Sequence, residues 1–189
     1  CLYYLINKFH KCGYSGTLGY GLDEFKDTYF TTPESNTFHK IMKEMLDLGC
    51  QSISFEVSSQ GLDLHRADTI DFDVVMFTNL THEHLDYHLD FENYYNAKAI
   101  LFKNVKKDGV AIINIDDEYA KRFIKDANCK AYTYGIDNDA DYKANNLILY
   151  VDHSEFDLCI KDKTYHIYTN ILAKYNISNL LCVLAALDL

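Results

Sequence analysis

A polar segment at residues 78–88 carries the densest set of side chains that could do chemistry. Three histidines and two acids fall within seven residues there. Imidazole nitrogens and carboxylate oxygens are common metal ligands in proteins, so this segment could hold a metal ion. The alternative is a solvated polar loop whose side chains cap a helix. The residues concerned are His82, Glu83, His84, Asp86 and His88.

Glu56 is a second candidate, at the end of a segment in which apolar and polar side chains alternate. The alternation over residues 51–57 predicts a strand, and Ser58 and Ser59 follow it. A glutamate at the carboxyl end of a strand suits Mg²⁺, which prefers oxygen ligands. If this strand runs parallel to the one before residue 78, Glu56 lies at the same edge of the sheet as the histidines. The alternative is an exposed acid at a strand end.

Lys98 is a third candidate, because it interrupts an apolar stripe. On a helix expected over residues 90–103, the inward positions carry Phe91, Tyr94, Tyr95, Leu101 and Phe102, with Lys98 among them. One interpretation is a snorkelling side chain whose ammonium group reaches water. The other is a lysine at the edge of a site, where burial lowers the pKa of the amine and makes it reactive.

The elements that must position these residues alternate between strands and helices. This order predicts an α/β fold with a mostly parallel sheet flanked by helices, and the short strands within 136–170 predict a small antiparallel subsheet. Thr32 is expected to cap the second helix, and Asp116 or Asp117 the fourth. Helices are expected at 1–11, 33–48, 90–103, about 117–126 and 177–189, and strands near 13–21, 51–57, 72–78, 109–113, 130–134, 142–151, 155–161 and 164–169.

Composition narrows the class of protein. The 189 residues fit one domain, and a net charge of −10 argues against nucleic-acid binding. No apolar run is long enough for a membrane span, and no secretory signal opens the chain. The six cysteines do not form metal-binding pairs, so we expect reduced, mostly buried thiols in a cytoplasmic protein. No glycine is followed by lysine, so these residues hold no phosphate-binding loop.

The candidate residues fall within a set of ordered motifs that resembles the central, ATP-binding domain of the Mur ligases, most closely the MurE type. The match runs along nearly the whole chain and is weakest over 136–170. The motifs are Glu56-Val57-Ser58-Ser59-Gln60-Gly61-Leu62, His65-Arg66, Phe77-Thr78-Asn79-Leu80, His84-Leu85-Asp86-Tyr87-His88, Tyr94-Tyr95-Asn96-Ala97-Lys98, Asn114-Ile115-Asp116-Asp117-Glu118 and Tyr175-Asn176-Ile177-Ser178-Asn179-Leu180.

The resemblance implies a P-loop NTPase-like fold and an ADP-forming ligase of bacterial cell-wall synthesis. Such enzymes phosphorylate a substrate carboxylate with ATP, and an amine then attacks the acyl phosphate. The MurE type adds the third amino acid to UDP-N-acetylmuramoyl-L-Ala-D-Glu. By position, Glu56 and His84 resemble ligands of Mg²⁺, and Lys98 resembles a lysine that carries a carbamate. A carbamate presents two anionic oxygens, whereas an ammonium group cannot bind a cation.

The resemblance also implies binding roles. Asn179 resembles the asparagine that contacts adenine, and Thr31, Thr32, Ser58 and Arg66 resemble residues that hold the UDP-sugar peptide. Arginine suits that task because its fork binds carboxylate or phosphate through two hydrogen bonds.

The sequence departs from the family pattern in ways that carry their own expectations. Glu83 stands where the family usually has aspartate, and Gln60 where the MurE type often has histidine. Relative to the family pattern, we expect the phosphate loop and the N- and C-terminal domains to lie outside these residues. We therefore expect residues 1–189 to be a partial central domain that is inactive alone. The choice between diaminopimelate and lysine lies in the missing C-terminal domain.

Three other functions remain open. The first is another ligase of the superfamily, such as MurF, MurC, folylpolyglutamate synthetase or cyanophycin synthetase. The second is a non-catalytic binding module descended from a ligase. The third is a metal hydrolase that uses His82, His84 and His88, of which only His84 and His88 have the spacing of four that places two ligands on one helix face.

Overall fold

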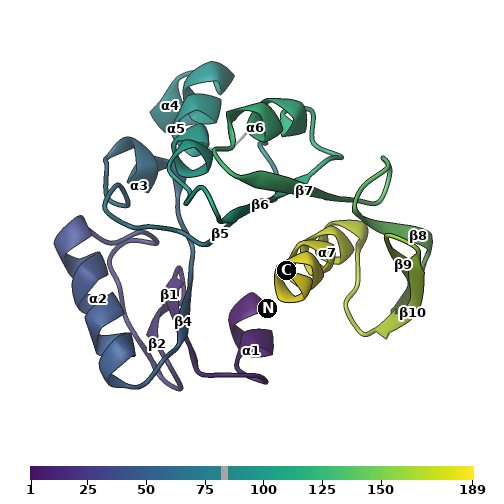
Figure 1. The fold of residues 1–189 in the computed structure, drawn as a ribbon, viewed down its shortest axis with the longest axis horizontal. Coiled ribbons are helices and arrows are strands. Elements are labelled where there is room, and N and C mark those ends of the chain that lie inside the picture. The colour runs from purple at the N-terminus through teal and green to yellow at the C-terminus, as the bar shows by residue number, and fades with distance from the viewer. Residues whose placement is uncertain (82–84) are drawn as a thin grey trace. The chain divides into compact units, whose positions relative to one another are not determined.

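The computed structural model describes residues 1–81 and 85–189, and the chain divides into two compact units (Figure 1). The described part of the first unit comprises residues 1–71 and 85–101, and that of the second comprises 72–81 and 102–189. Both units combine strands and helices, which confirms the α/β class. The strands form two sheets, however, rather than the one that their order along the chain predicts.

The first unit contains a four-stranded sheet in the order β3-β2-β1-β4. β1 pairs parallel with β4, and the other two pairs are antiparallel. The strands are β1 (Cys12–Gly16), β2 (Gly19–Gly21), β3 (Phe25–Lys26) and β4 (Ser52–Phe55). The helices are α1 (Leu2–Ile6), α2 (Ser35–Asp47), α3 (Ser59–Asp63), α4 (Leu85–His88) and α5 (Phe91–Lys103), whose last two residues belong to the second unit.

Helix α2 packs on this sheet through the apolar stripe expected from its sequence. Phe38, Ile41 and Met45 are buried on it. Met45 lies so close to β1 that a Cβ on Gly13 would come within 2.7 Å of the Met45 Cγ. Only glycine therefore lets the helix approach the strand without a shift.

Local bonds explain why two helix boundaries differ from expectation. α1 ends at Ile6 rather than residue 11, because the Asn7 side chain bonds the backbone of Cys12. Its Oδ1 accepts the Cys12 N–H at 3.0 Å, and its Nδ2 donates to the Cys12 carbonyl at 2.8 Å. α2 begins at Ser35 with Glu34 as its N-cap, so the predicted cap at Thr32 is wrong.

The second unit contains a six-stranded sheet in the order β10-β9-β8-β7-β6-β5. The pairs from β5 to β8 are parallel, and β8, β9 and β10 pair antiparallel. The expected antiparallel strands are therefore an extension of the parallel sheet. The elements are β5 (Val74–Phe77), β6 (Val110–Asn114), α6 (Ala120–Asp126), β7 (Lys130–Gly135), β8 (Tyr142–Leu149), β9 (Ser154–Ile160), β10 (Lys163–Thr169) and α7 (Lys174–Asp188).

Helix α7 lies along the strands of this unit and closes its core (Figure 1). Ile177, Leu181 and Ala185 on the helix are fully buried against Tyr134 and Phe156 of the sheet. The cap of α6 is Tyr119, without a side-chain bond, so neither Asp116 nor Asp117 is its N-cap. All six cysteines are free thiols, but only Cys12, Cys50 and Cys182 are buried, so the expectation of mostly buried thiols holds for half of them. Among the described residues, no helix has the length and apolarity to cross a membrane.

Candidate functional site

The Glu56 carboxylate lies one residue beyond β4 and is held by residues of β1 and the turn after it. The Tyr14 hydroxyl donates to its Oε1 at 2.6 Å. The Thr17 backbone N–H and hydroxyl donate to Oε2 at 2.9 and 2.7 Å. Burial raises the pKa of Glu56, but these three hydrogen bonds outweigh it and bring the pKa below its ordinary value. The group is therefore a fixed anion at neutral pH.

Gly16 makes room for this arrangement. A Cβ at this position would lie 2.5 Å from the Tyr14 hydroxyl oxygen and 2.6 Å from the Glu56 Cδ. Any side chain on Gly16 would therefore push the tyrosine and the carboxylate apart.

Thr31 and Thr32 enter the same site with different roles. The Thr17 hydroxyl uses its one proton on Glu56, so at 3.2 Å it accepts a hydrogen bond from the Thr31 hydroxyl. The Thr32 hydroxyl donates to the Glu56 backbone carbonyl at 3.2 Å and accepts from the Ser58 N–H at 2.8 Å. Thr32 thus ties the segment before α2 to the segment after β4, which explains why it does not cap α2.

Ser58 and Arg66 lie at the two ends of α3. The Ser58 Oγ accepts the Gly61 N–H at 3.0 Å and caps the helix. Arg66 donates to the Thr32 carbonyl at 3.0 Å, pairs with Glu34 at 2.8 Å and stacks on Phe30 at 4.3 Å. Its Nε is buried, with no hydrogen-bond partner among the described residues.

Five of the eight residues that the sequence singled out therefore come together in the first unit. They are Thr31, Thr32, Glu56, Ser58 and Arg66. A glutamate carboxylate has about four lone-pair positions, and three are occupied by Tyr14 and Thr17. One remains for a cation, so Glu56 fits a metal ion as a ligand through a single oxygen.

Lys98 lies on α5 of the same unit, half-buried, as its place on the stripe predicts. Its Nζ is 5.3 Å from the centre of the Tyr94 ring, within the range of a cation–π contact. Tyr94 and Tyr95 are almost completely buried beside it.

The remaining expected site residues are placed differently. His84, together with His82 and Glu83, lies outside the described residues. Asn179 is exposed on α7 of the second unit. His88, the third histidine of the hydrolase alternative, bonds the Ser59 Oγ through its Nε2 at 2.9 Å. Within the described part of the chain, no three histidine, cysteine or acidic side chains are grouped to hold a metal ion.

A cavity of about 610 Å³ opens beside His88 in the first unit. The Tyr87 hydroxyl donates to Asp63 at 2.9 Å on its wall. Its lining residues are Asp63, Tyr87, His88, Asn93, Asn96, Ala97 and Ile100.

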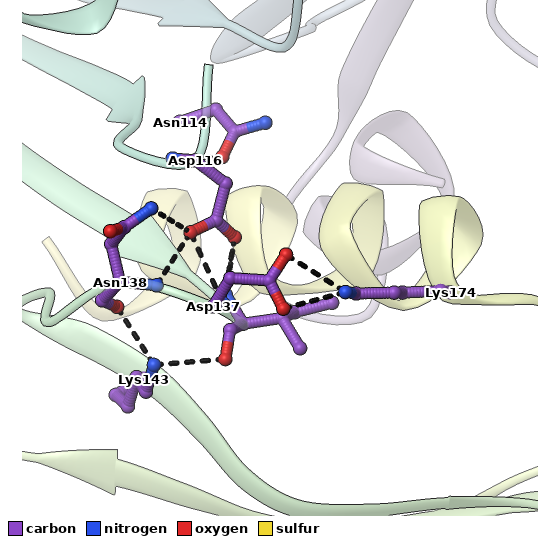
Figure 2. Close-up of polar contacts among 7 residues, drawn as sticks. Asn114, Asp116, Asp137, Asn138, Lys143 and Lys174 are labelled. Atoms are coloured by element: carbon purple, nitrogen blue, oxygen red, sulfur yellow. Dashed lines mark hydrogen bonds and ion pairs between the residues drawn. The ribbon is translucent and has the colours of Figure 1, made fainter. Parts of the chain in front are cut away.

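A polar cluster that sequence reasoning missed surrounds Asp116 in the second unit (Figure 2). The Asp116 carboxylate accepts the backbone N–H groups of Ile136, Asp137 and Asn138 at 2.6 to 3.1 Å, and the Asn138 side chain at 3.0 Å. Burial raises the pKa of Asp116, but these bonds outweigh it and lower the pKa overall.

Two lysines complete the cluster, and one of them links it to α7. The Lys143 Nζ donates to the carbonyls of Ile136 and Asn138 at 2.9 and 2.8 Å. Lys174, the first residue of α7, pairs with Asp137 at 2.6 Å (Figure 2). The cluster therefore fixes the start of the helix that carries Asn179.

Neighbours of Asp116 hold the segment that leads to the histidines. The Asn114 side chain donates to the Thr78 carbonyl at 2.8 Å, and Asp117 accepts the Leu80 N–H at 2.9 Å. The motif Asn114-Ile115-Asp116-Asp117 was the available sequence signal. The motif alone does not reveal that these residues bond segments far away in the sequence, because those contacts form only in the folded chain.

The chain is similar to proteins of one family. Residues 2–187 match the family model described as Mur ligase middle domain. The chain is 44% identical over 178 residues to UDP-N-acetylmuramoyl-L-alanyl-D-glutamate–2,6-diaminopimelate ligase 1 of Clostridium acetobutylicum, covering 94% of this chain and 36% of that protein. It is 36% identical over 178 residues to UDP-N-acetylmuramoyl-L-alanyl-D-glutamate–L-lysine ligase of Staphylococcus haemolyticus, covering 92% and 36%.

A solved structure of a UDP-N-acetylmuramoyl-L-alanyl-D-glutamate–2,6-diaminopimelate ligase superposes with a TM-score of 0.89 at 30% identity. That alignment covers 99% of this chain and 39% of that protein. The chain thus spans little more than a third of the length of the relatives it matches.

Proposed function

Because this chain belongs to the Mur ligase family, whose middle domain it matches over residues 2–187, we propose that it forms the central part of an ADP-forming amide ligase. The reaction is addition of the third amino acid to UDP-N-acetylmuramoyl-L-alanyl-D-glutamate during synthesis of the bacterial cell wall. The names of the similar ligases support this substrate. The reaction belongs in the bacterial cytoplasm, where ATP and nucleotide-linked sugars are available.

The observation that carries the proposal is the Glu56 carboxylate, held as an anion by Tyr14 and Thr17 with one position left for a cation. When bound, ATP supplies the phosphoryl group and Mg²⁺ neutralises its charge. Glu56 is then one ligand of Mg²⁺, and His84 is another that the resemblance implies. Asn179 is proposed to contact the adenine ring.

The substrate is held, in this proposal, by the residues gathered around α3. Ser58, Thr31 and Thr32 present hydroxyl groups to the UDP-sugar peptide. Arg66 offers its guanidinium to a carboxylate of the peptide, and Glu34 on the surface holds that guanidinium in the meantime. A bound carboxylate can replace Glu34 because the glutamate side chain is 59% exposed and gains little from the pair.

Lys98 is proposed to act as a carbamate. The ammonium group first loses one proton, and the neutral amine then adds to carbon dioxide with loss of a second proton, which leaves an anionic carbamate with two carboxylate oxygens.

The ligase proposal is tested on the complete protein that contains these residues. We expect ADP to form only when the UDP-linked dipeptide, ATP and either diaminopimelate or lysine are all present. Both amino acids are tried, because ligases named for each are similar to this chain. Residues 1–189 alone are expected to form no product. If ADP forms with neither diaminopimelate nor lysine, the proposal is contradicted.

The carbamate role has its own test. Lys98→Ala in the complete protein should lower turnover by about 100-fold or more, since a ligand of the phosphoryl-transfer site is lost. A short carboxylate such as acetate or propionate should restore part of it, because it can occupy the space of the missing carbamate. Full turnover in the variant without added carboxylate would exclude the role.

A further inference from the structure

His88 is a buried polar residue to which the proposed mechanism gives no role. It ends α4 and is 5% exposed. Burying an imidazole is unfavourable unless its nitrogens are hydrogen-bonded, so the contacts of His88 show which elements hold it in place. Two of these contacts lead to elements of the proposed site.

The first contact leads to Ser58. The His88 Nε2 lies 2.9 Å from the Ser59 Oγ, and Ser59 is itself 3% exposed. Ser59 is the first residue of α3, directly after the capping Ser58. A displacement of the Ser59 side chain therefore moves the helix end that orients Ser58.

The second contact leads to Lys98. The His88 ring stacks on Tyr94 with centres 5.0 Å apart and planes 15° apart. Lys98 lies one turn after Tyr94 on α5, with its Nζ 5.3 Å from the centre of the Tyr94 ring. Because Tyr94 is 4% exposed, its ring has little freedom to move independently of His88.

We propose that His88 is a positioning residue that couples Ser58 to Lys98 through Ser59 and Tyr94. All five residues lie in one compact unit, so the path does not depend on how the units are arranged. The inference rests on the proposed function, because it takes Ser58 as a substrate contact and Lys98 as a carbamate.

Two substitutions separate the two arms of this path in the complete protein. His88→Phe keeps a flat ring against Tyr94 but loses the bond to Ser59, so KM for the UDP-linked dipeptide should rise about tenfold with kcat little changed. His88→Gln keeps a polar group for Ser59 but loses the stacked ring, so kcat should fall about tenfold with KM little changed.

Ser59→Ala provides an independent variant, because it removes only one oxygen. It should raise KM as His88→Phe does. The double variant Ser59→Ala/His88→Phe should have a KM no higher than that of either single variant, since both substitutions remove the same bond. The matched control is His10→Gln. His10 makes the same kind of bond, to the Ser52 Oγ at 2.8 Å, but on the surface. It should change neither constant.

The proposal is overturned if Ser59→Ala and the His88 variants behave like His10→Gln. It is also overturned if KM and kcat change together in every variant, as a general loss of stability would produce. If His88→Phe fails to fold, Ser59→Ala and His88→Gln decide between the two arms.

A measurement without turnover separates this inference from the ligase proposal. Because the Lys98 Nζ lies 5.3 Å from the centre of the Tyr94 ring, the ring current of Tyr94 should shift the ¹³Cε and ¹Hε resonances of Lys98 in residues 1–189. These resonances should move in Ser59→Ala and stay in place in His10→Gln. If the complete protein makes no ADP but the resonances move, the ligase proposal fails and the coupling stands. If they stay in place, the coupling fails whatever the activity.

Discussion

At Glu56, two neighbouring residues keep the carboxylate charged. Tyr14 and Thr17 supply three donors, and the tyrosine is 8% exposed although its hydroxyl reaches the carboxylate. The sequence indicated Glu56 from its place after a strand, but Tyr14 reads only as a good strand former. Its role depends on the parallel pairing of β1 with β4, which local patterns do not reveal.

The first prediction at this scale concerns pH. Tyr14→Phe should destabilise residues 1–189 by about 1 kcal/mol at pH 7, because a hydrogen bond to a charged, partly exposed group is lost. The lowered pKa of Glu56 stabilises the folded state above the ordinary value of 4.5, and this contribution is lost as the pH falls through the folded pKa. Urea unfolding of both proteins should therefore show a difference that narrows below pH 4.5. If the difference in unfolding free energy between the two proteins stays constant below pH 4.5, Tyr14 does not bond the ionised Glu56 carboxylate.

The second prediction compares two adjacent positions of β1. Gly16→Ala should destabilise by about 1–3 kcal/mol, because its Cβ would overlap Tyr14 and Glu56. Ser15→Ala is the control, since the buried Ser15 hydroxyl has no hydrogen-bond partner among the described residues. It should be neutral or stabilising. Thermal unfolding of both variants measures the contrast, and equal effects would show that crowding is not the cause.

At the scale of elements, hydrophobic periodicity predicted the helices and strands that can be recognised from their own residues alone. α5, β6 and α7 match their expected ranges within a few residues, because their apolar spacing reflects one buried face. The pairing of strands was not predictable in this way. β4 and β5 lie in different sheets, so the expected shared edge for Glu56 and the histidine segment is wrong. Thr32 reads as a cap locally, yet its hydroxyl bonds Glu56 and Ser58.

The prediction at this scale concerns the Asp116 cluster. Asp116→Asn replaces one accepting oxygen with a donor that faces N–H groups, so we expect a loss of about 1–3 kcal/mol and faster amide exchange at residues 136–138. The lowered pKa of Asp116 stabilises the fold above the ordinary value of 3.8, and the loss should shrink as the pH falls through the folded pKa. Asp139→Asn, the same change of charge on an exposed side chain, is the control. Equal exchange rates in both variants would contradict the role of Asp116.

At the scale of the whole molecule, the two units are interleaved along the chain. Residues 72–81 belong to the second unit, although residues of the first unit lie on both sides of them in the sequence. α4 provides the partners of Ser59 and Asp63 in the first unit, and its His88 stacks on Tyr94 of α5. Residues 1–71 alone should therefore remain unfolded, with no cooperative transition in circular dichroism, whereas residues 1–189 unfold cooperatively. A cooperative transition in the shorter segment would contradict this dependence.

The interleaving also has a consequence while the polypeptide is being made. The ribosome releases the chain from its N-terminus, so the first unit cannot close until α5 has emerged. By then β5 is already outside, and its neighbour β6 has yet to emerge. During that interval, the apolar residues Val74–Phe77 have no strand to pair with. A chaperone that binds exposed apolar segments would therefore have its main effect at this stage of synthesis.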